Sequence, residues 1–154
     1  MSAAAFTLRA YRAADEEAAI ELWRRTWQLA YPRLDFTARL EWWRQRWRHE
    51  LAPTAMITVA ESEGQLLGFV TVDPRTQYLD QIVVAPEAWG SRVAGALIAE
   101  AKQLSPAGLD LAVNADNGRA IRFYEKQGFT ITRTDVNPRS GAPIRKMSWR
   151  PDDG

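Results

Sequence analysis

The sequence contains no cysteine and only one histidine, and these two shortages exclude several kinds of chemistry. Without cysteine there is no disulfide, no thiolate nucleophile and no cysteine-ligated metal. The lone histidine, His49, cannot form a cluster of histidine ligands. We therefore expect neither a bound metal nor a disulfide framework.

The chain also lacks a charge excess and a long apolar run. Its 20 Lys and Arg against 19 Asp and Glu leave a net charge of +1. That balance gives no broad field to attract nucleic acid or an anionic membrane. No window approaches about 18 consecutive apolar residues, and residues 1–7 lack the charged and apolar regions of a secretion signal. We expect a cytoplasmic protein with neither a nucleic-acid nor a membrane partner.

What remains is the composition of an ordinary globular protein. A length of 154 residues, with 46% apolar and 25% charged side chains, is enough for one core and too short for two ordinary domains. The chain shows no internal repeat and no linker. We therefore expect a single domain over residues 1–154.

Two amphipathic helices lead the chain. Apolar side chains recur at helical spacing over residues 14–30, behind acidic residues that suit a helix N-terminus, and Pro32 should end this helix. Asp35 or Thr37 can cap a second helix. Its shared apolar face would consist of Leu40, Trp43, Trp47 and Leu51.

The pattern then changes to strands separated by two further helices. Strands are predicted over residues 56–60, 66–72, 77–84, 109–113, 129–134 and 144–149, with room for an edge strand over 6–9. Helices are predicted over residues 89–104 and 119–127. This order implies an α/β protein of the α+β kind, with a central mixed β-sheet flanked by helices.

Two segments place backbone donors and polar side chains at the carboxyl end of a strand, where ligands bind in open α/β sheets. In the first, Val84 to Leu97, the free N–H groups of a first helical turn can hold a phosphate or pyrophosphate. Gly90 and Ala94 would allow close approach to the backbone. A purely structural role stays open, because any connection between a strand and a helix uses small residues.

The second segment runs from Asn114 to Phe129. Asn117 or Asp116 would cap its helix and Gly128 would stop it. Tyr124 can keep its ring buried while its hydroxyl reaches a cleft. A buried tyrosine with only a structural hydrogen bond is the alternative interpretation.

Together the two segments resemble the GNAT superfamily of N-acetyltransferases. The resemblance spans the chain, and its specific part is the series Asn117-x-x-Ala120-x-x-x-Tyr124-x-x-x-Gly128-Phe129, which follows Val84-x-Pro86 and a helix. It implies a GNAT-like acyl-CoA N-acyltransferase fold and transfer of an acetyl group from acetyl-CoA to an amine.

The resemblance also implies roles for individual residues. Backbone N–H groups across Gly90 to Ala94 would hold the pyrophosphate of acetyl-CoA, Asn117 would contact the cofactor, and Tyr124 would point at the thioester sulfur. The cofactor-binding residues expected on this basis are Ile82, Val83, Val84, Trp89, Gly90, Ser91, Arg92, Val93, Ala94, Asn117 and Tyr124.

The chain departs from the family's Gln/Arg-x-x-Gly-x-Gly/Ala pattern at two positions, with Trp89 where Gln or Arg is common and Arg92 where Gly is common. The β-carbon of Arg92 can crowd a pyrophosphate, whereas its guanidinium can pair with a cofactor phosphate. The departure leaves a second hypothesis, a non-catalytic acyl-CoA-binding or regulatory module of the same fold.

Acetyl transfer to an amine requires a neutral amine, a stabilised oxyanion and a leaving thiolate. An alkyl ammonium has a pKa of about 10.4 and must first lose a proton to a base. Asp80 is the candidate, because the period of two places Tyr78, Asp80, Ile82 and Val84 on one face of their strand; a solvated carboxylate is the competing interpretation. Main-chain N–H groups near residues 82–84 would meet the oxyanion, and Tyr124 would act as the general acid.

The acceptor should meet the leading helices, the hairpin turn and the last two strands. A tryptophan stripe at helical spacing is more often core than ligand cage, but the adjacent Trp42 and Trp43 cannot face the same way. We expect Trp27, Tyr31 and Tyr78 to contact the acceptor, a small-molecule or peptide amine. Exposed aromatics could also form a homodimer face.

The second helix supports one further interpretation. Its basic residues Arg39, Arg44, Arg46 and Arg48, with the interleaved tryptophans, would suit nucleic acid or a membrane surface. The near-zero net charge and the nearby Glu41 and Glu50 favour a solvated helix face instead.

Overall fold

The computed structural model describes residues 5–151, which form one seven-stranded mixed sheet in the order β1-β2-β3-β4-β5-β7-β6. Neighbouring strands are antiparallel except β4 and β5, which are parallel. The elements are β1 (Thr7–Ala10), α1 (Glu16–Ala30), α2 (Leu40–Arg46), β2 (Met56–Ser62), β3 (Gln65–Asp73), β4 (Tyr78–Val84), α3 (Val93–Leu104), β5 (Leu109–Asn114), α4 (Gly118–Lys126), β6 (Thr130–Val136) and β7 (Pro143–Trp149). The predicted mixed sheet, including its edge strand, is confirmed.

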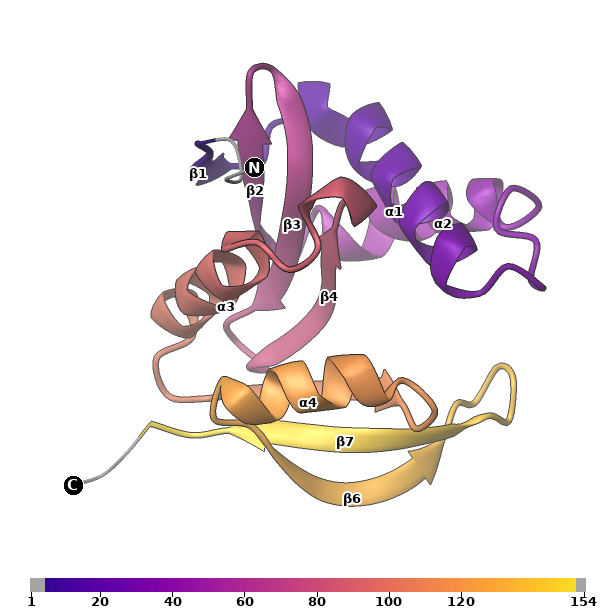
Figure 1. Ribbon diagram of the computed structural model, residues 1–154, viewed down its shortest axis with the longest axis vertical. Coiled ribbons are helices and arrows are strands. Elements are labelled where there is room, and N and C mark those ends of the chain that lie inside the picture. The colour runs from indigo at the N-terminus through magenta and orange to yellow at the C-terminus, as the bar shows by residue number, and fades with distance from the viewer. Residues whose placement is uncertain (1–4, 152–154) are drawn as a thin grey trace.

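The helices cover the sheet from two sides. Figure 1 shows α1 and α2 beside the upright strands β2 to β4, α3 across the same strands, and α4 lying along β7 in the lower half. Side chains of α1 and α2 pack with Val59, Phe69 and Val83 in one apolar cluster. Those of α3 and α4 pack with other strand residues in a second cluster. Two cores therefore hold the sheet between them.

Tryptophans are the largest side chains of the first core. Trp23 of α1 and Trp43 of α2 stack with their ring centroids 4.5 Å apart, and Trp47 meets Phe69 edge-on at 5.2 Å. Trp43 is 1% exposed, whereas the adjacent Trp42 is 39% exposed. The tryptophan stripe is therefore mainly core, and the two neighbouring rings do face apart.

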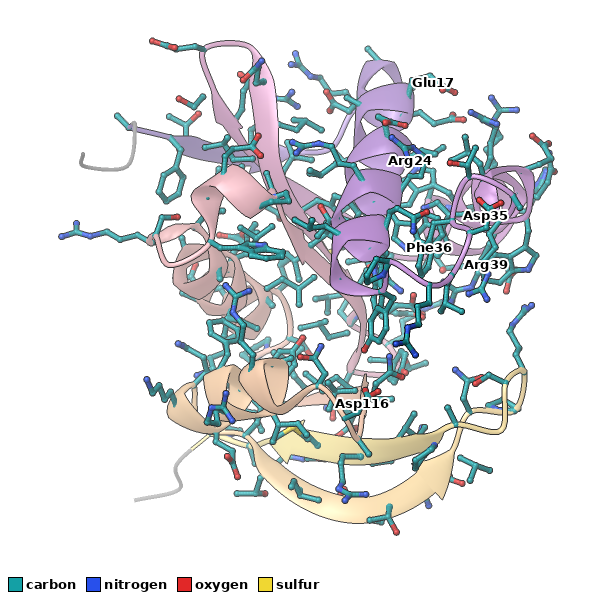
Figure 2. The ribbon with its side chains drawn as sticks, turned by 45° about the vertical axis from the view of Figure 1, so that its right-hand side comes forward. Glu17, Arg24, Asp35, Phe36, Arg39 and Asp116 are labelled. Carbon is teal, nitrogen blue, oxygen red and sulfur yellow. The ribbon has the colours of Figure 1, made fainter. Side chains whose placement is uncertain are left out.

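Arginines of the α2 region are largely occupied by carboxylates. Arg44 forms ion pairs with Glu17 and Glu41, and Arg48 pairs with Glu16. Figure 2 shows Glu17 near the start of α1, where these contacts tie α1 to α2. Most of the positive charge that would attract a phosphate backbone is therefore neutralised locally.

Helix α3 begins at Val93, later than the predicted start at residue 89. Pro86 to Ala88 form a short 3-10 turn, and Gly90 follows with a φ of +78°. A right-handed helix cannot pass through a residue with positive φ, so the chain forms an open turn before the helix starts.

Strand β4 contains a β-bulge that the period of two does not predict. Thr71 pairs with Gln81 and Val72 with Leu79, so Asp80 has no partner on β3. Leu79 and Val84 face the second cluster while Val83 faces the first. The expectation that Tyr78, Asp80, Ile82 and Val84 share one face is therefore wrong, because the extra residue reverses the alternation.

Strands β4 and β5 pair at one position only, Tyr78 with Asp110. Beyond that pair the two strands diverge, and in Figure 1 the lower strands cross beneath the upright ones. Near Val84, the edge of β4 that faces away from β3 therefore has no strand beside it.

No helix within residues 5–151 is both long and apolar enough to cross a membrane. Most of the segment considered above for a secretion signal, residues 1–4, lies outside the described residues, as do residues 152–154.

Candidate functional site

A cleft of about 540 Å³ opens where β4 and β5 diverge. Its walls are the C-terminal end of α1, the end of β4, the turn before α3, and α4. A cleft at the carboxyl ends of diverging parallel strands is the usual ligand position in open α/β sheets.

The cleft brings together most of the residues singled out from the sequence. Its lining includes Trp27, Tyr31, Ile82, Val83, Val84, Trp89, Gly90, Ser91, Ala94, Asn117 and Tyr124. Arg92, Val93, Asp80 and Tyr78 are not among its lining residues. Val93 points into the core at 0% exposure. The bulge at Asp80 turns the lower part of β4 out of line with Ile82 and Val84.

The turn before α3 presents unused backbone donors. Within residues 5–151, the N–H groups of Gly90, Arg92 and Ala94 make no hydrogen bond, whereas that of Ser91 donates to the Ala88 carbonyl at 3.2 Å. The N-terminus of a helix adds the positive end of its dipole to such donors. This turn can therefore hold an anionic group without help from any side chain.

Trp89 occupies part of this region. Its indole N–H donates to the Val84 carbonyl at 2.8 Å, on the end of β4. The Arg119 guanidinium of α4 lies 4.3 Å from the centre of the Trp89 ring. The pair joins the turn before α3 to α4 across the cleft.

Sequence reasoning missed a row of positive charges on α4. Arg119, Arg122 and Lys126 all line the cleft, and none forms an ion pair within the described part of the chain. Their spacing of three and four residues places them on one helical face, a signal that the sequence did contain. The row provides long cationic side chains near the donors of the turn.

Tyr124 lines the cleft while being 8% exposed. Its ring packs between Phe123 and Phe129, at centroid distances of 5.4 and 5.6 Å. Burial, with a smaller contribution from Tyr78, raises the pKa of the Tyr124 hydroxyl well above its usual value. The phenol therefore stays protonated at neutral pH and can donate a hydrogen bond or a proton.

Asn117 caps α4, as one of the two predicted residues. Its side-chain oxygen accepts from the Ala120 N–H at 3.2 Å. Asn117 also lines the cleft, and the capping hydrogen bond fixes the orientation of its side chain there.

Asp80 is held in a two-pronged ion pair. Arg46 of α2 donates to its two oxygens at 2.7 and 2.8 Å, and the two side chains are 18% and 21% exposed. The carboxylate raises the pKa of the Arg46 guanidinium. Arg46 therefore occupies both carboxylate oxygens of Asp80.

The α1 end of the cleft carries an aromatic pair and a hydrogen-bond network. Tyr31 stacks on Trp27 with ring centroids 5.5 Å apart and planes 15° apart. Its hydroxyl accepts from the Asn114 side chain at 2.9 Å and donates to Asp116 at 3.4 Å. Figure 2 shows Asp116 below the C-terminal end of α1. Asn114 and Asp116 are far from Tyr31 in the sequence and come close to it only in the folded chain. No local sequence pattern therefore marks them as partners of Tyr31.

A second hollow of about 470 Å³ lies by β1 and the end of α3. Its Arg9 is already bound to Asp15 and Glu61. Its phenol, Tyr11, accepts a hydrogen bond from the Trp47 indole N–H at 2.9 Å. Across the described residues no group of three or more His, Cys, Asp or Glu side chains could hold a metal ion.

Comparison with known proteins identifies related chains. The family model described as Acetyltransferase (GNAT) family matches residues 16–129. Peptidyl-lysine N-acetyltransferase YiaC of Escherichia coli (strain K12) is 31% identical over 132 residues, which are 86% of this chain and 88% of the relative.

Two solved structures share the fold. The apo form of YjaB from Escherichia coli superposes with a TM-score of 0.77 at 24% identity, over 94% of this chain and 97% of that one. The PaiA N-acetyltransferase of Thermoplasma acidophilum, in complex with coenzyme A, gives a TM-score of 0.75 at 20% identity, over 96% and 99%. The fold therefore recurs in proteins of remote sequence.

Proposed function

The chain belongs to the GNAT family of acetyltransferases, and we propose that it moves an acetyl group from acetyl-CoA to a primary amine by direct attack in a ternary complex. The observation that carries the proposal is the turn with unused N–H groups at Gly90, Arg92 and Ala94, of which Gly90 and Ala94 line a cleft that also holds a protonated phenol, Tyr124. A diphosphate needs the first feature and a leaving thiolate benefits from the second.

The residues present fit the cofactor. The backbone donors of the turn would hold its diphosphate, and the row Arg119, Arg122 and Lys126 would balance the remaining phosphate charge. The Arg92 side chain, predicted either to crowd or to bind a phosphate, is exposed and outside the cleft lining, so it does not fill the turn. When bound, acetyl-CoA supplies the acetyl group as a thioester.

The chain's own groups then have distinct tasks. The unpaired edge of β4 near Ile82 to Val84 would direct main-chain N–H groups at the developing oxyanion. Tyr124 would give its proton to the departing thiolate, which is a fair leaving group because a thiol has a pKa of about 8.5. The phenol should therefore help turnover without being indispensable.

The general base stays a prediction. Asp80 is the predicted base, but both of its carboxylate oxygens contact Arg46 and it does not line the cleft. Tyr78, the third predicted acceptor contact, also lies outside the lining residues, whereas Trp27 and Tyr31 belong to it.

We infer that the acceptor is a primary amine of a peptide or a small molecule. The relative YiaC is named a peptidyl-lysine N-acetyltransferase, which favours a lysine side chain. The aromatic pair of Trp27 and Tyr31 would suit the aliphatic part of such a side chain. A cytoplasmic location, a single domain over residues 1–154 and a homodimer also stay predictions.

One experiment tests the function against the non-catalytic alternative. Melting temperature is measured with acetyl-CoA and with a phosphate-free pantetheine thioester, and thiol release is then followed with a panel of amines. We expect acetyl-CoA to raise the melting temperature and the pantetheine thioester to leave it unchanged, because the phosphates supply the contacts to the turn. We also expect thiol release that depends on the amine. Stabilisation without thiol release for any amine would support the binding module instead.

A further inference from the structure

A negative charge lies next to the acceptor end of the cleft, on Asp116, which is not a lining residue but contacts the lining residue Tyr31. Asp116 lies in the loop between β5 and α4, and within the described residues its carboxylate forms no ion pair. Its side-chain contact is the Tyr31 hydroxyl, 3.4 Å away. A surface carboxylate that has no ion-pair partner among the described residues can bind a cation.

The network around Tyr31 fixes that carboxylate relative to the cleft. The Tyr31 hydroxyl receives a hydrogen bond from Asn114 and gives one to Asp116, so both of its hydrogen-bonding functions are used. Burial raises the pKa of Tyr31, which keeps the hydroxyl protonated and able to donate. The contacts join the end of α1 to the end of β5, residues far apart in the sequence.

The backbone of the same segment is also anchored. The Gln28 side chain donates to the Leu34 carbonyl at 2.6 Å and accepts from the Phe36 N–H at 3.0 Å, which closes the turn that follows Tyr31. Figure 2 shows Phe36 beside the end of α1. These hydrogen bonds therefore hold Tyr31 in position before any ligand binds.

The combination matches what an alkyl ammonium requires. An aromatic face attracts a cation, and a neighbouring carboxylate supplies the opposite charge. The other carboxylate near β4, Asp80, is already neutralised by Arg46. We propose that Asp116, with the stacked rings of Trp27 and Tyr31, forms the site that selects acceptors carrying an ammonium group. This inference rests on the proposed function and names the charge class of its acceptor.

The test compares two amines in steady-state kinetics. The first is Nα-acetyl-lysine methylamide, whose side-chain amine is almost wholly protonated near pH 7 because its pKa is about 10.4. The second is trifluoroethylamine, whose fluorines make it weakly basic and hence largely neutral. Asp116→Asn should raise the KM for the lysine derivative about two- to fivefold, with little change in kcat and no change for trifluoroethylamine. Asp135→Asn, an exposed carboxylate on β6, is the matched control.

A binding measurement separates this inference from the proposed function. Calorimetry with the lysine derivative and CoA-saturated protein needs no turnover, and we expect weaker binding by Asp116→Asn and Tyr31→Phe. If the wild-type protein releases no thiol, the proposed function fails, while the binding result still tests whether Asp116 binds the ammonium group. Equal KM values for wild type and Asp116→Asn, equal loss for both amines, or a fall in kcat alone would each overturn the inference.

Discussion

The two ends of the cleft are built in different ways. The turn before α3 offers backbone N–H groups of neighbouring residues, Gly90, Arg92 and Ala94. The acceptor end is assembled from side chains of α1 and the β5–α4 loop, with Tyr31 and Asp116 separated by 85 positions. A backbone site tolerates side-chain replacement as long as the turn keeps its shape. A side-chain site can change its ligand by single substitutions.

The largest effect is expected where the backbone site is broken. Gly90 has a φ of +78° and Gly64, in the turn between β2 and β3, a φ of +79°, with no atom within 4 Å of an added Cβ at either. A branched residue should cost about 1–3 kcal/mol of backbone strain at each. Gly90→Val should in addition weaken acetyl-CoA binding by at least about tenfold. Gly64→Val is the control. Calorimetry with acetyl-CoA compares the two variants, and equal affinities of Gly90→Val and Gly64→Val for acetyl-CoA would show that the turn is not the binding element.

The next effect concerns chemistry without binding. Tyr124→Phe should lower kcat about ten- to a hundredfold, because a general acid contributes about that or more, while acetyl-CoA affinity stays nearly unchanged. Tyr11→Phe is the control, since Tyr11 is a half-buried phenol that lines the other hollow. Full activity of Tyr124→Phe at several pH values would remove Tyr124 as the general acid.

Asp80 offers a test of stability against catalysis. Asp80→Asn leaves the half-buried Arg46 cation without its partner, and should lower the free energy of unfolding by about 1–3 kcal/mol. Urea unfolding measures that loss. Turnover is then compared below the melting range. Unchanged kcat would assign Asp80 a structural role only, and a large fall would make it the base despite the ion pair.

The pH dependence of stability follows from the buried phenol. The folded state holds Tyr124 protonated with a raised pKa, whereas the unfolded chain ionises it near about pH 10. The contribution of Tyr124 to the free energy of unfolding is therefore complete below about pH 10. Above that pH it falls by about 1.4 kcal/mol per pH unit. Tyr124→Phe should show a shallower decline in unfolding free energy at alkaline pH. Parallel declines for both proteins would mean that the phenol is not buried.

The smallest effect is expected from the cationic row. Arg119→Gln removes the charge beside Trp89 and should weaken acetyl-CoA binding a few-fold, since an exposed pair contributes about 1 kcal/mol or less. The salt dependence of binding should fall with it. Arg133→Gln on the exposed strand β6 is the control. An identical salt dependence in the Arg119 variant would remove that side chain from the cofactor site.

The same contrast explains what the sequence could predict. The element order, the Asn117 cap and the turn around Gly90 are local features, and each has a signature within a few residues. The bulge at Asp80 depends on pairing with β3, so alternation alone gave the wrong face. Tyr31 was found as an aromatic residue, but its partners Asn114 and Asp116 become neighbours only once the two halves of the sheet meet.

Binding of the cofactor diphosphate by the turn before α3 is tested most directly by the amide NMR spectrum during titration with acetyl-CoA. We expect large shifts of the Gly90, Arg92 and Ala94 amides, which should be much smaller with a phosphate-free thioester, and little change at Gly64. Saturable binding that leaves those three amides unmoved, or moves residues around Met56 in the other hollow instead, would contradict it.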